Sequence, residues 1–525
     1  MNHIELFAGC GGLSLGLDQA GFELTLANEL SPMAAESFVY NFFDENLECL
    51  AKEQHKHVNA IWLNSKYPDL KARLRENPFQ FPSYGEDGYS DLPDNLDELK
   101  GKLIVGSIVD LNRLLDDKPE LVQLLQNGFG KSGLDLVSGG PPCQSFSMAG
   151  LRKRDCEKNT LPWEFAKFVK HTQPRIALLE NVTGILRPFK DEEGNEFHAW
   201  YEVAKVFASY GYVPLCLHIN ARLIGIAQNR PRFIMIAVRN NHLKNIYPLL
   251  DDNSQKLFEE PLRFFDIVQK ANGDAQSVSF GHLSFIDAIK NNSIFMNSLL
   301  KPLVDGKLVS VRDAIDDLKR GNPSKPSPFI DKLNQTFALL PKREKLSNHD
   351  FRQNSDIVRR RFRIYQILQE LNDRNIVKDV FAILKGQSNT LENASWEQLK
   401  EYKFLLENNK LQRFDSKSEF EAFLRQHPTK KQTQKALVAD EPAPAALSIP
   451  DDACHYDSNE LRVLTVREMA RIQSFPDNFV FRSKVTTGGQ MRKFEVPQYT
   501  QVGNAVPPLL GLALGSVLKS LLPIN

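Results

Sequence analysis

Several features that mark particular classes of protein are scarce or missing in this chain of 525 residues. Its six cysteines are scattered without a C-x-x-C pair, which argues against a zinc site and against a disulfide framework and favours a reducing compartment. The 65 basic residues balance the 65 acidic ones, so the overall charge indicates neither a nucleic acid nor a membrane partner. Any anion-binding face must therefore be local.

Long apolar runs are also missing. No stretch approaches about 18 uninterrupted apolar residues, and no charged leader or apolar signal region precedes the first strand-like segment. We therefore expect a soluble intracellular protein with no metal site and no membrane partner.

Short apolar runs alternate with helix-like segments over residues 1–240. These runs lie near 3–7, 23–28, 102–106, 134–138, 175–179, 213–219 and 232–238. The alternation predicts an α/β fold with a doubly wound, mostly parallel sheet. Between about 41 and 100 it is interrupted by an acidic stretch that also contains Pro, Asn and Tyr, which we interpret as an insertion on the rim of the sheet.

The alternation disappears after residue 240. Residues 241–454 contain a few helical segments, such as 356–371 and 416–426, and end in an Ala- and Pro-rich stretch that is typical of a linker. Further on, a capping box at 465–468 opens a helix, and Pro507-Pro508 introduces a closing apolar helix. We predict a first domain over 1–240, a smaller second domain with its linker over 241–454, and a C-terminal segment over 455–525 that returns to the first domain.

One cysteine stands on a stiff loop directly after an apolar run. The loop is GGPPCQSFS at residues 139–147. Its two glycines permit a sharp exit from a strand, and its two prolines fix φ, so the chain is rigid where Cys143 emerges. A thiol displayed in this way suits nucleophilic attack, although a lone cysteine is commonly a buried structural residue. The loop alone supports both interpretations equally.

Other polar residues and turns also follow predicted strands. The glycine-rich turn at 9–16 would bring backbone close to a ligand, but it lacks the G-x-G-x-x-G fingerprint and also fits a tight connection. Glu29 can accept hydrogen bonds from ribose hydroxyls or simply be solvated. Glu180 suits a hydrogen bond to a ring nitrogen, because desolvation favours its neutral form. Arg230 and Arg232, in QNRPR, offer planar donor groups, although surface salt bridges are the default for such arginines.

These segments resemble the ordered motifs of the DNA (cytosine-5) methyltransferases. The matching segments are FAGCGGLSLG at 7–16, Glu29, GGPPCQSFS at 139–147, ENV at 180–182, QNRPR at 228–232, LTVREMARIQSFPDNF at 464–479 and QVGNAVPP at 501–508. The resemblance covers roughly residues 1–40, 102–240 and 455–525. Each motif also lies where the patterning independently places a strand end or a turn, which leaves little room for coincidence.

The resemblance implies a Rossmann-like fold that uses S-adenosyl-L-methionine, and it assigns catalytic roles. Cys143 would add to C6 of a target cytosine, so that C5 becomes nucleophilic enough to accept a methyl group. Glu180 would contact N3 and the exocyclic amine, while Arg232 and Arg230 would hold the O2 side and orient Cys143. The implied cofactor-binding residues are Phe7, Gly9, Gly12, Leu13, Glu29, Ser107, Ile108, Pro142, Leu161, Asn504 and Val506.

The chain departs from the family pattern in two places. Ser107-Ile108 stands where many members have Asp-Ile, so a carboxylate contact with adenine is lost or replaced by a hydroxyl. Ala227 stands where a proline is usual, which we expect to matter little.

The resemblance also implies double-stranded DNA as the partner, with the target base flipped out of the duplex. Residues 241–454 occupy the place of the target recognition domain. The basic segment 342–363 suits phosphate contacts, or it is an exposed helix face. Within it, Asn348-His349 and Arg352 loosely resemble a motif of some members' recognition region.

The family context indicates a bacterial restriction-modification protein. We expect a cytoplasmic, nucleoid-associated monomer that protects host DNA from a cognate endonuclease acting separately. Cytosine-5 methylation of RNA is an alternative, disfavoured by Ser145-Phe146-Ser147 and the long second domain. A catalytically silent DNA-binding protein is another, disfavoured by Cys143, Glu180 and Arg232. A nicotinamide dehydrogenase is disfavoured because the fingerprint is missing.

Overall fold

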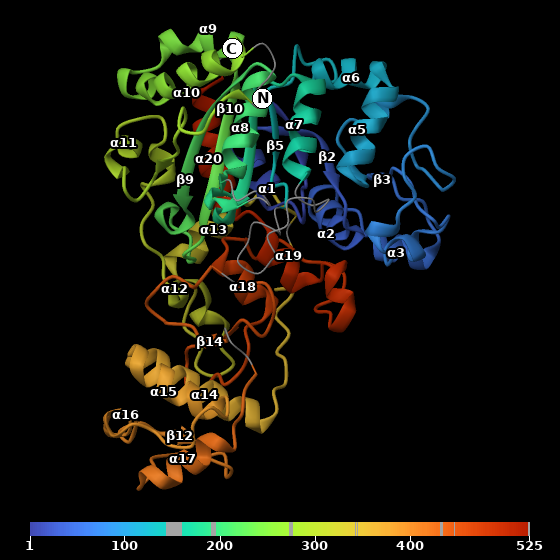
Figure 1. Cartoon of the computed structure of the whole chain (residues 1–525). Coiled ribbons are helices and arrows are strands. Elements are labelled where there is room, and N and C mark those ends of the chain that lie inside the picture. Colours follow the sequence, from blue (N-terminus) through green and yellow to red (C-terminus); the bar gives the residue numbers. More distant parts are fainter. Residues whose placement is uncertain are drawn as a thin grey trace.

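The computed structural model describes residues 1–142, 160–190, 196–271, 277–341, 343, 345–430, 434–445 and 447–522. At its centre lies a nine-stranded sheet (Figure 1). Its strands are β1 (Asn2–Leu6), β2 (Glu23–Glu29), β3 (Ala60–Trp62), β4 (Lys102–Val105), β5 (Leu136–Gly139), β6 (Ile176–Val182), β9 (Tyr212–Asn220), β10 (Pro231–Arg239) and β11 (Ile286–Asp287).

The strand order is β11-β9-β10-β6-β5-β1-β2-β4-β3. Neighbouring strands are parallel, except that β10 runs antiparallel to both β6 and β9. From β1 the chain moves outward to β2 and then to the edge strand β3, and it comes back through β4 to form β5 on the other side of β1. The loops after β1 and β5 therefore leave the sheet at a topological switch point, where sheets of this kind bind their ligands.

The predicted α/β fold with a mostly parallel sheet is confirmed. All the predicted strands are present, with shifts of a few residues at their ends. The sequence patterns missed β3 and β11, which are too short to show a period. They form the two edges of the sheet, and β3 belongs to the segment 41–100 that we interpreted as a rim insertion.

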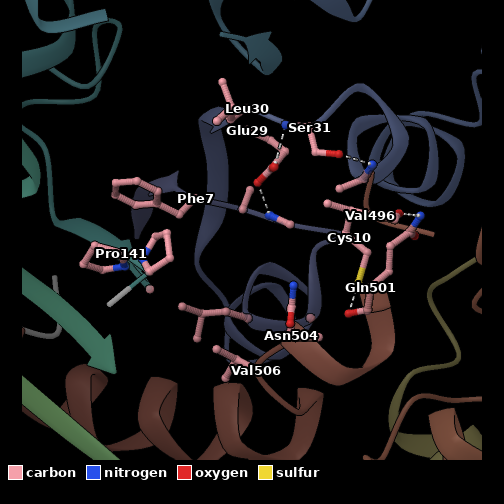
Figure 2. Close-up of a pocket in the computed structure, with 18 of the residues that line it drawn as sticks. Phe7, Cys10, Glu29, Leu30, Ser31, Pro141, Val496, Gln501, Asn504 and Val506 are labelled. Carbon is pink, nitrogen blue, oxygen red and sulfur yellow. Dashed lines mark hydrogen bonds between the residues drawn. The ribbon is translucent and has the colours of Figure 1, made fainter. Parts of the chain in front are cut away.

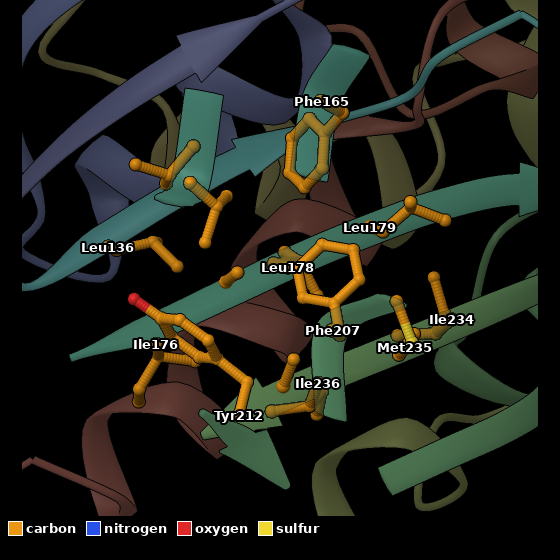
Figure 3. Close-up of a cluster of buried hydrophobic side chains, with 14 of the residues drawn as sticks. Leu136, Phe165, Ile176, Leu178, Leu179, Phe207, Tyr212, Ile234, Met235 and Ile236 are labelled. Carbon is orange, nitrogen blue, oxygen red and sulfur yellow. The ribbon is translucent and has the colours of Figure 1, made fainter. Parts of the chain in front are cut away.

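Two layers of helices cover the sheet. One contains α5 (Ile108–Asp117), α6 (Pro119–Gln126), α7 (Leu161–Thr172) and α8 (Ala199–Ser209), and the other contains α1 (Gly12–Gln19) and α20 (Pro508–Ser520). Figure 3 shows Phe165 of α7 and Phe207 of α8 lying over β5, β6 and β10, as part of the largest buried apolar cluster. Two helices that follow residue 240, α9 (Asn240–Ile246) and α10 (Asp252–Lys270), pack into the same cluster.

Helices α1 and α20 approach each other through glycines. A Cβ atom at Gly16 would lie under 3.0 Å from the Pro508 carbonyl oxygen and the Leu512 nitrogen. A Cβ at Gly511 would lie 2.9 Å from the Leu13 carbonyl oxygen. Backbone atoms on both helices therefore occupy the space that larger side chains would need. This contact joins the C-terminal segment to α1, the first helix of the chain.

We expect Gly16→Ala to lower the free energy of unfolding by about 2–3 kcal/mol, because an added methyl group must push the two helices apart. Alanine is the better helix former by about 1 kcal/mol, so any destabilisation must come from this clash. Urea unfolding measures the difference. The control is Gly321→Ala, since no atom lies within 4 Å of the Cβ position there. Equal stability of Gly16→Ala and the wild type would contradict the close packing.

Two further groups of helices lie below the sheet in Figure 1. An intermediate cluster contains α12 (Val311–Ile315), α13 (Pro328–Thr336), α18 (Val466–Ile472) and α19 (Gln498–Asn504). A separate cluster is built on α14 (Asp356–Leu371), α15 (Arg374–Leu384), α16 (Asn393–Leu399) and α17 (Lys417–Arg425). The helices predicted near 356–371 and 416–426 are thus confirmed. The division at residues 240 and 454 stays a prediction.

The capping box predicted at the start of α18 is confirmed. Thr465 Oγ1 accepts a hydrogen bond from the Glu468 N–H at 3.2 Å, and Glu468 Oε2 accepts one from the Thr465 N–H at 2.7 Å. Glu468 is also paired with Arg462 at 2.7 Å, so the buried carboxylate is neutralised.

In the part of the chain that the structure describes, no single helix is long and apolar enough to span a membrane. One bent pair, 489–504 with 508–520, meets the length and composition criteria together, and most of α20 is buried.

Candidate active site

A cavity of about 460 Å³ opens at the carboxyl ends of β1, β2, β4, β5 and β6. All the residues predicted to bind the cofactor line it, from Phe7 near the N-terminus to Val506 near the C-terminus. Glu180, Arg230 and Arg232 line it as well. The predicted nucleophile, Cys143, lies outside the described residues, which stop at Pro142 on the cavity wall.

Glu29 holds the loops that follow β1 and β2. Its Oε2 accepts a hydrogen bond from the Gly9 N–H at 2.7 Å, and its Oε1 accepts one from the Ser31 N–H at 2.7 Å (Figure 2). Gly9 has a φ of 57°, a left-handed conformation that glycine adopts without strain. Each carboxylate oxygen keeps a further lone pair, so the predicted contact with ribose hydroxyls stays chemically open.

A second carboxylate, Glu5, lies buried in the cavity wall. The Ser14 hydroxyl donates a hydrogen bond to it. Burial raises the pKa of Glu5 to about 8, and the negative charge of Glu29 adds to this effect. Burial also raises the pKa of Glu29. Our site prediction missed Glu5, although an acid between two apolar residues of a strand, Ile4 and Leu6, is a recognisable signal.

The raised pKa of Glu5 makes stability depend on pH. The usual pKa is 4.5 and the folded value is about 8, so the unfolded chain loses the Glu5 proton first as pH rises. The contribution of Glu5 to stability is therefore fully present below pH 4.5 and is lost as pH rises towards 8. The Glu5→Gln side chain cannot ionise. We therefore expect the urea midpoint of Glu5→Gln to rise relative to that of the wild type when the pH is raised from 4.5 to 8. The same difference between the two urea midpoints at both pH values would contradict the raised pKa of Glu5.

Two buried side chains shape the turn at 501–506. Gln501 Nε2 lies within hydrogen-bond distance of the carbonyl oxygens of Met33, Arg482 and Val496, at 3.0–3.2 Å, and donates to them. The Arg230 guanidinium donates to the carbonyls of Gly503 at 2.7 Å and Ala505 at 3.0 Å. These bonds place Asn504 and Val506 at the cavity wall.

The described contacts of Arg230 therefore support a positioning role in this turn. Its burial lowers the pKa of the guanidinium well below its usual value, and the nearby Arg232 adds to this effect. Its predicted contact with a base stays a prediction.

Glu180 and Arg232 form an ion pair at the far end of the cavity. Arg232 Nε lies 2.6 Å from Glu180 Oε1, and both side chains are almost fully buried. The two residues come from neighbouring antiparallel strands, since Arg232 pairs with Val182 in the β10–β6 register. A pair held by two strands has little freedom to move, and its charges are screened less by water than at a surface.

The loop after β5 is fixed beside this ion pair. Asn181 Nδ2 donates to the Pro141 carbonyl at 2.9 Å. A Cβ atom at Gly140 would lie 3.0 Å from Glu180 Oε2, so the carboxylate rests against the loop backbone. The chain that leads to Cys143 therefore departs next to Glu180 and Arg232.

Other lining residues had no signal in the sequence. They are Pro78 and Phe79 from the insertion, Phe494 and Val496 from the C-terminal segment, and Ala34 of α2 (Pro32–Phe42). Ser107, which replaces an expected acid, caps α5 by accepting the Val109 N–H at 3.1 Å. Its hydroxyl hydrogen remains a possible donor to a ligand.

Several polar residues of the basic segment 342–363 are used inside the protein. His349 contacts Thr465 Oγ1 at 2.9 Å and the Leu318 carbonyl at 3.0 Å. Arg361 donates to the Pro428 carbonyl at 2.8 Å, and Arg363 donates to the Lys403 carbonyl at 3.0 Å. The bonds from Arg361 and Arg363 join segments of the second domain, and the His349–Thr465 contact reaches the C-terminal segment. The predicted phosphate contacts of segment 342–363 stay a prediction.

Among the described residues, no group of three or more His, Cys, Asp or Glu side chains is placed to hold a metal ion. The chemistry available in the cavity is that of two buried acids, one ion pair and exposed backbone.

Comparison with known proteins identifies the family. The chain matches the family described as C-5 cytosine-specific DNA methylase over residues 1–68 and 119–520. It is 24% identical to the Type II methyltransferase M1.HphI of Haemophilus parahaemolyticus over 523 residues, which cover 99% of this chain and 87% of that protein. Identity to the Type II methyltransferase M.DdeI of Desulfomicrobium norvegicum is 24% over 516 residues, with coverage of 98% and 87%.

Among solved structures, the S. pombe Dnmt2 methyltransferase aligns with a TM-score of 0.39 at 14% identity, over 99% of this chain and 98% of that one. The family match alone covers most of this sequence, including the segments that carry the ordered motifs. The chain therefore belongs to the C-5 cytosine-specific DNA methylase family, as its motifs predict.

Proposed function

We propose that this protein transfers a methyl group from S-adenosyl-L-methionine to C5 of a cytosine in double-stranded DNA, through a covalent bond between Cys143 and C6. The observation that carries this proposal is the single cavity at the switch point of the sheet. It brings the predicted cofactor residues, the Glu180–Arg232 ion pair and the loop leading to Cys143 to one place. The family supports the reaction and the DNA substrate.

The cavity fits this cofactor in size and charge. Its volume of about 460 Å³ is within the usual range of small-molecule sites. When bound, the cofactor supplies a methyl group on a positively charged sulfonium. Glu5 and Glu29 line the same cavity, and a cationic ligand favours their ionised forms. At Gly12 the backbone packs directly against the Val506 carbonyl oxygen, and a Cβ there would collide with that oxygen.

The order of the strands indicates which end of the cavity holds which part of the ligand. Glu29 and Ser107 lie after β2 and β4, on one side of β1, whereas Glu180 lies at the end of β6, on the other side. We infer that the adenosine end is held at β2 and β4. The methyl-bearing end of the cofactor would then lie towards the loop after β5, which leads to Cys143.

The protein's own residues perform the covalent step. The Cys143 thiolate forms a sulfur–carbon bond at C6, and the electron pair of the C5–C6 double bond becomes available at C5. Glu180 accepts a hydrogen bond from the exocyclic amine of the cytosine, and Arg232 holds Glu180 and the O2 side. After methylation, the C5 proton leaves, its electron pair restores the double bond, and the sulfur–carbon bond breaks to return the thiolate. A base inside the duplex cannot reach Cys143, so the cytosine is flipped out.

We also propose that residues 241–454 recognise the target sequence. The Type II methyltransferases that the chain resembles support a role in restriction-modification, with a cognate endonuclease acting separately. We propose that the protein acts as a monomer in the bacterial cytoplasm.

Incubation of the purified protein with methyl-labelled S-adenosylmethionine tests the proposed reaction. We expect label in duplex DNA and none in transfer RNA. Bisulfite sequencing of DNA from expressing cells then identifies the methylated cytosine and its sequence context. Label in transfer RNA alone would overturn the proposal in favour of RNA methylation.

A further inference from the structure

Residues 75–84 of the insertion cross the edge of the cavity and are anchored on both sides. On one side, Arg75 pairs with Glu36 of α2 at 3.1 Å. On the other side, the Tyr84 N–H donates to Asp110 of α5 at 3.2 Å. Helices α2 and α5 follow β2 and β4, so this segment lies over the ends of those two strands. That is the end of the cavity where Glu29 and Ser107 lie.

The short helix η1 (Pro78–Gln80) sets the position of Phe79 between these anchors. The Asn77 side chain caps this helix by accepting the Phe79 N–H at 3.1 Å. Pro78 and Phe79 both line the cavity. Phe79 is 54% exposed, whereas the nearby Phe81 packs against the buried cluster that contains Phe38 and Trp62. The same segment therefore buries one aromatic ring and presents the other at the cavity.

We propose that Phe79 forms the outer wall of the cofactor site and stacks on the adenine ring. This inference rests on the proposed use of S-adenosylmethionine. If Glu29 holds the ribose and Ser107-Ile108 lies beside the adenine, the flat base lies at the end of the cavity that is also lined by Phe79. A phenyl ring offers that base a π face and becomes less exposed when covered.

Glu29 is followed by Leu30, an aliphatic residue that also lines the cavity. Phe79 falls between the two segments that match the family, 1–68 and 119–520, so the insertion adds this wall to the common site. The insertion thereby acquires a function in cofactor affinity.

Calorimetric titration with S-adenosyl-L-homocysteine tests this assignment. Loss of a base–aromatic stack weakens binding by roughly 5- to 100-fold, which is the effect we expect for Phe79→Ala. Phe79→Trp restores a π face and should bind within a few fold of the wild type. Its tryptophan fluorescence should change on adding ligand more than that of the wild type. The matched control is Tyr89→Ala, because Tyr89 is an exposed ring of the same insertion that lies outside the cavity lining.

Urea unfolding of each variant checks that the fold is intact. Wild-type affinity in Phe79→Ala would overturn the stacking role, and so would equal losses in Phe79→Ala and Tyr89→Ala. If the wild type itself binds no S-adenosylhomocysteine, the proposed cofactor use fails and this inference fails with it. If the wild type binds and all variants bind equally, only the role of Phe79 fails.

Discussion

Replacing Cys143 with serine is expected to abolish methyl transfer to duplex DNA, a loss of at least about four orders of magnitude. A serine hydroxyl stays protonated at neutral pH and is a far weaker nucleophile than a thiolate. The described end of the loop supports this role, because Asn181 holds Pro141 and Glu180 rests against Gly140. Single-turnover transfer of labelled methyl groups measures the loss.

A duplex that contains 5-fluorocytosine gives a second readout for Cys143. Fluorine blocks the last elimination, so the wild-type protein should remain attached to the DNA on a denaturing gel, and Cys143→Ser should not. The matched control is Cys49→Ser, since Cys49 is an exposed free cysteine that does not line the cavity. A trapped complex with Cys143→Ser, or its loss with Cys49→Ser, would show that the nucleophile is assigned wrongly.

Replacing Glu180 with glutamine is expected to lower the methyl-transfer rate by about 10²- to 10⁴-fold. Glutamine keeps the shape of the side chain but removes its negative charge. The buried Arg232 then loses the carboxylate that lies 2.6 Å from its Nε, and the target cytosine loses the acceptor for its exocyclic amine. Both effects act at the end of the cavity to which we assign the proposed covalent step.

The position of Glu180 separates this loss from a loss of cofactor. We expect Glu180→Gln to bind S-adenosylhomocysteine nearly as tightly as the wild type, because Glu180 lies at β6 and the proposed position of the adenosine end is at β2 and β4, on the other side of β1. The control is Glu202→Gln, which breaks an ion pair with Lys205 at 2.8 Å that lies outside the cavity lining. A rate for Glu180→Gln within about tenfold of the wild type would remove Glu180 from the reaction.

The main sheet could be predicted because each long strand is a local apolar run between turn-forming residues. The capping box at Thr465 and the helix at 356–371 follow from neighbours in the sequence as well. The strands β3 and β11 could not be predicted, since two or three residues carry no period and their pairing depends on the edges of a sheet already formed.

The candidate site also combines features that the local sequence predicts with contacts that only the folded chain makes. Motif order and residue type select Glu180, Arg232 and the residues expected to bind the cofactor, because a strand end, a glycine turn and a polar side chain can be recognised within a few residues. Their roles stay predictions. Whether these segments share one cavity depends on contacts between residues far apart in the chain. The bonds from Arg230 to the carbonyls of Gly503 and Ala505 are an example.

Only the tertiary structure places Glu5 beside Glu29 and brings Phe79 to the cavity. Local sequence patterns can indicate a strand, a cap or a reactive type of side chain, because those properties depend on a few neighbouring residues. Burial, the resulting pKa shift and the closing of a cavity depend on which distant segments exclude water from the same place. The packing of those distant segments in the tertiary structure therefore decides these properties.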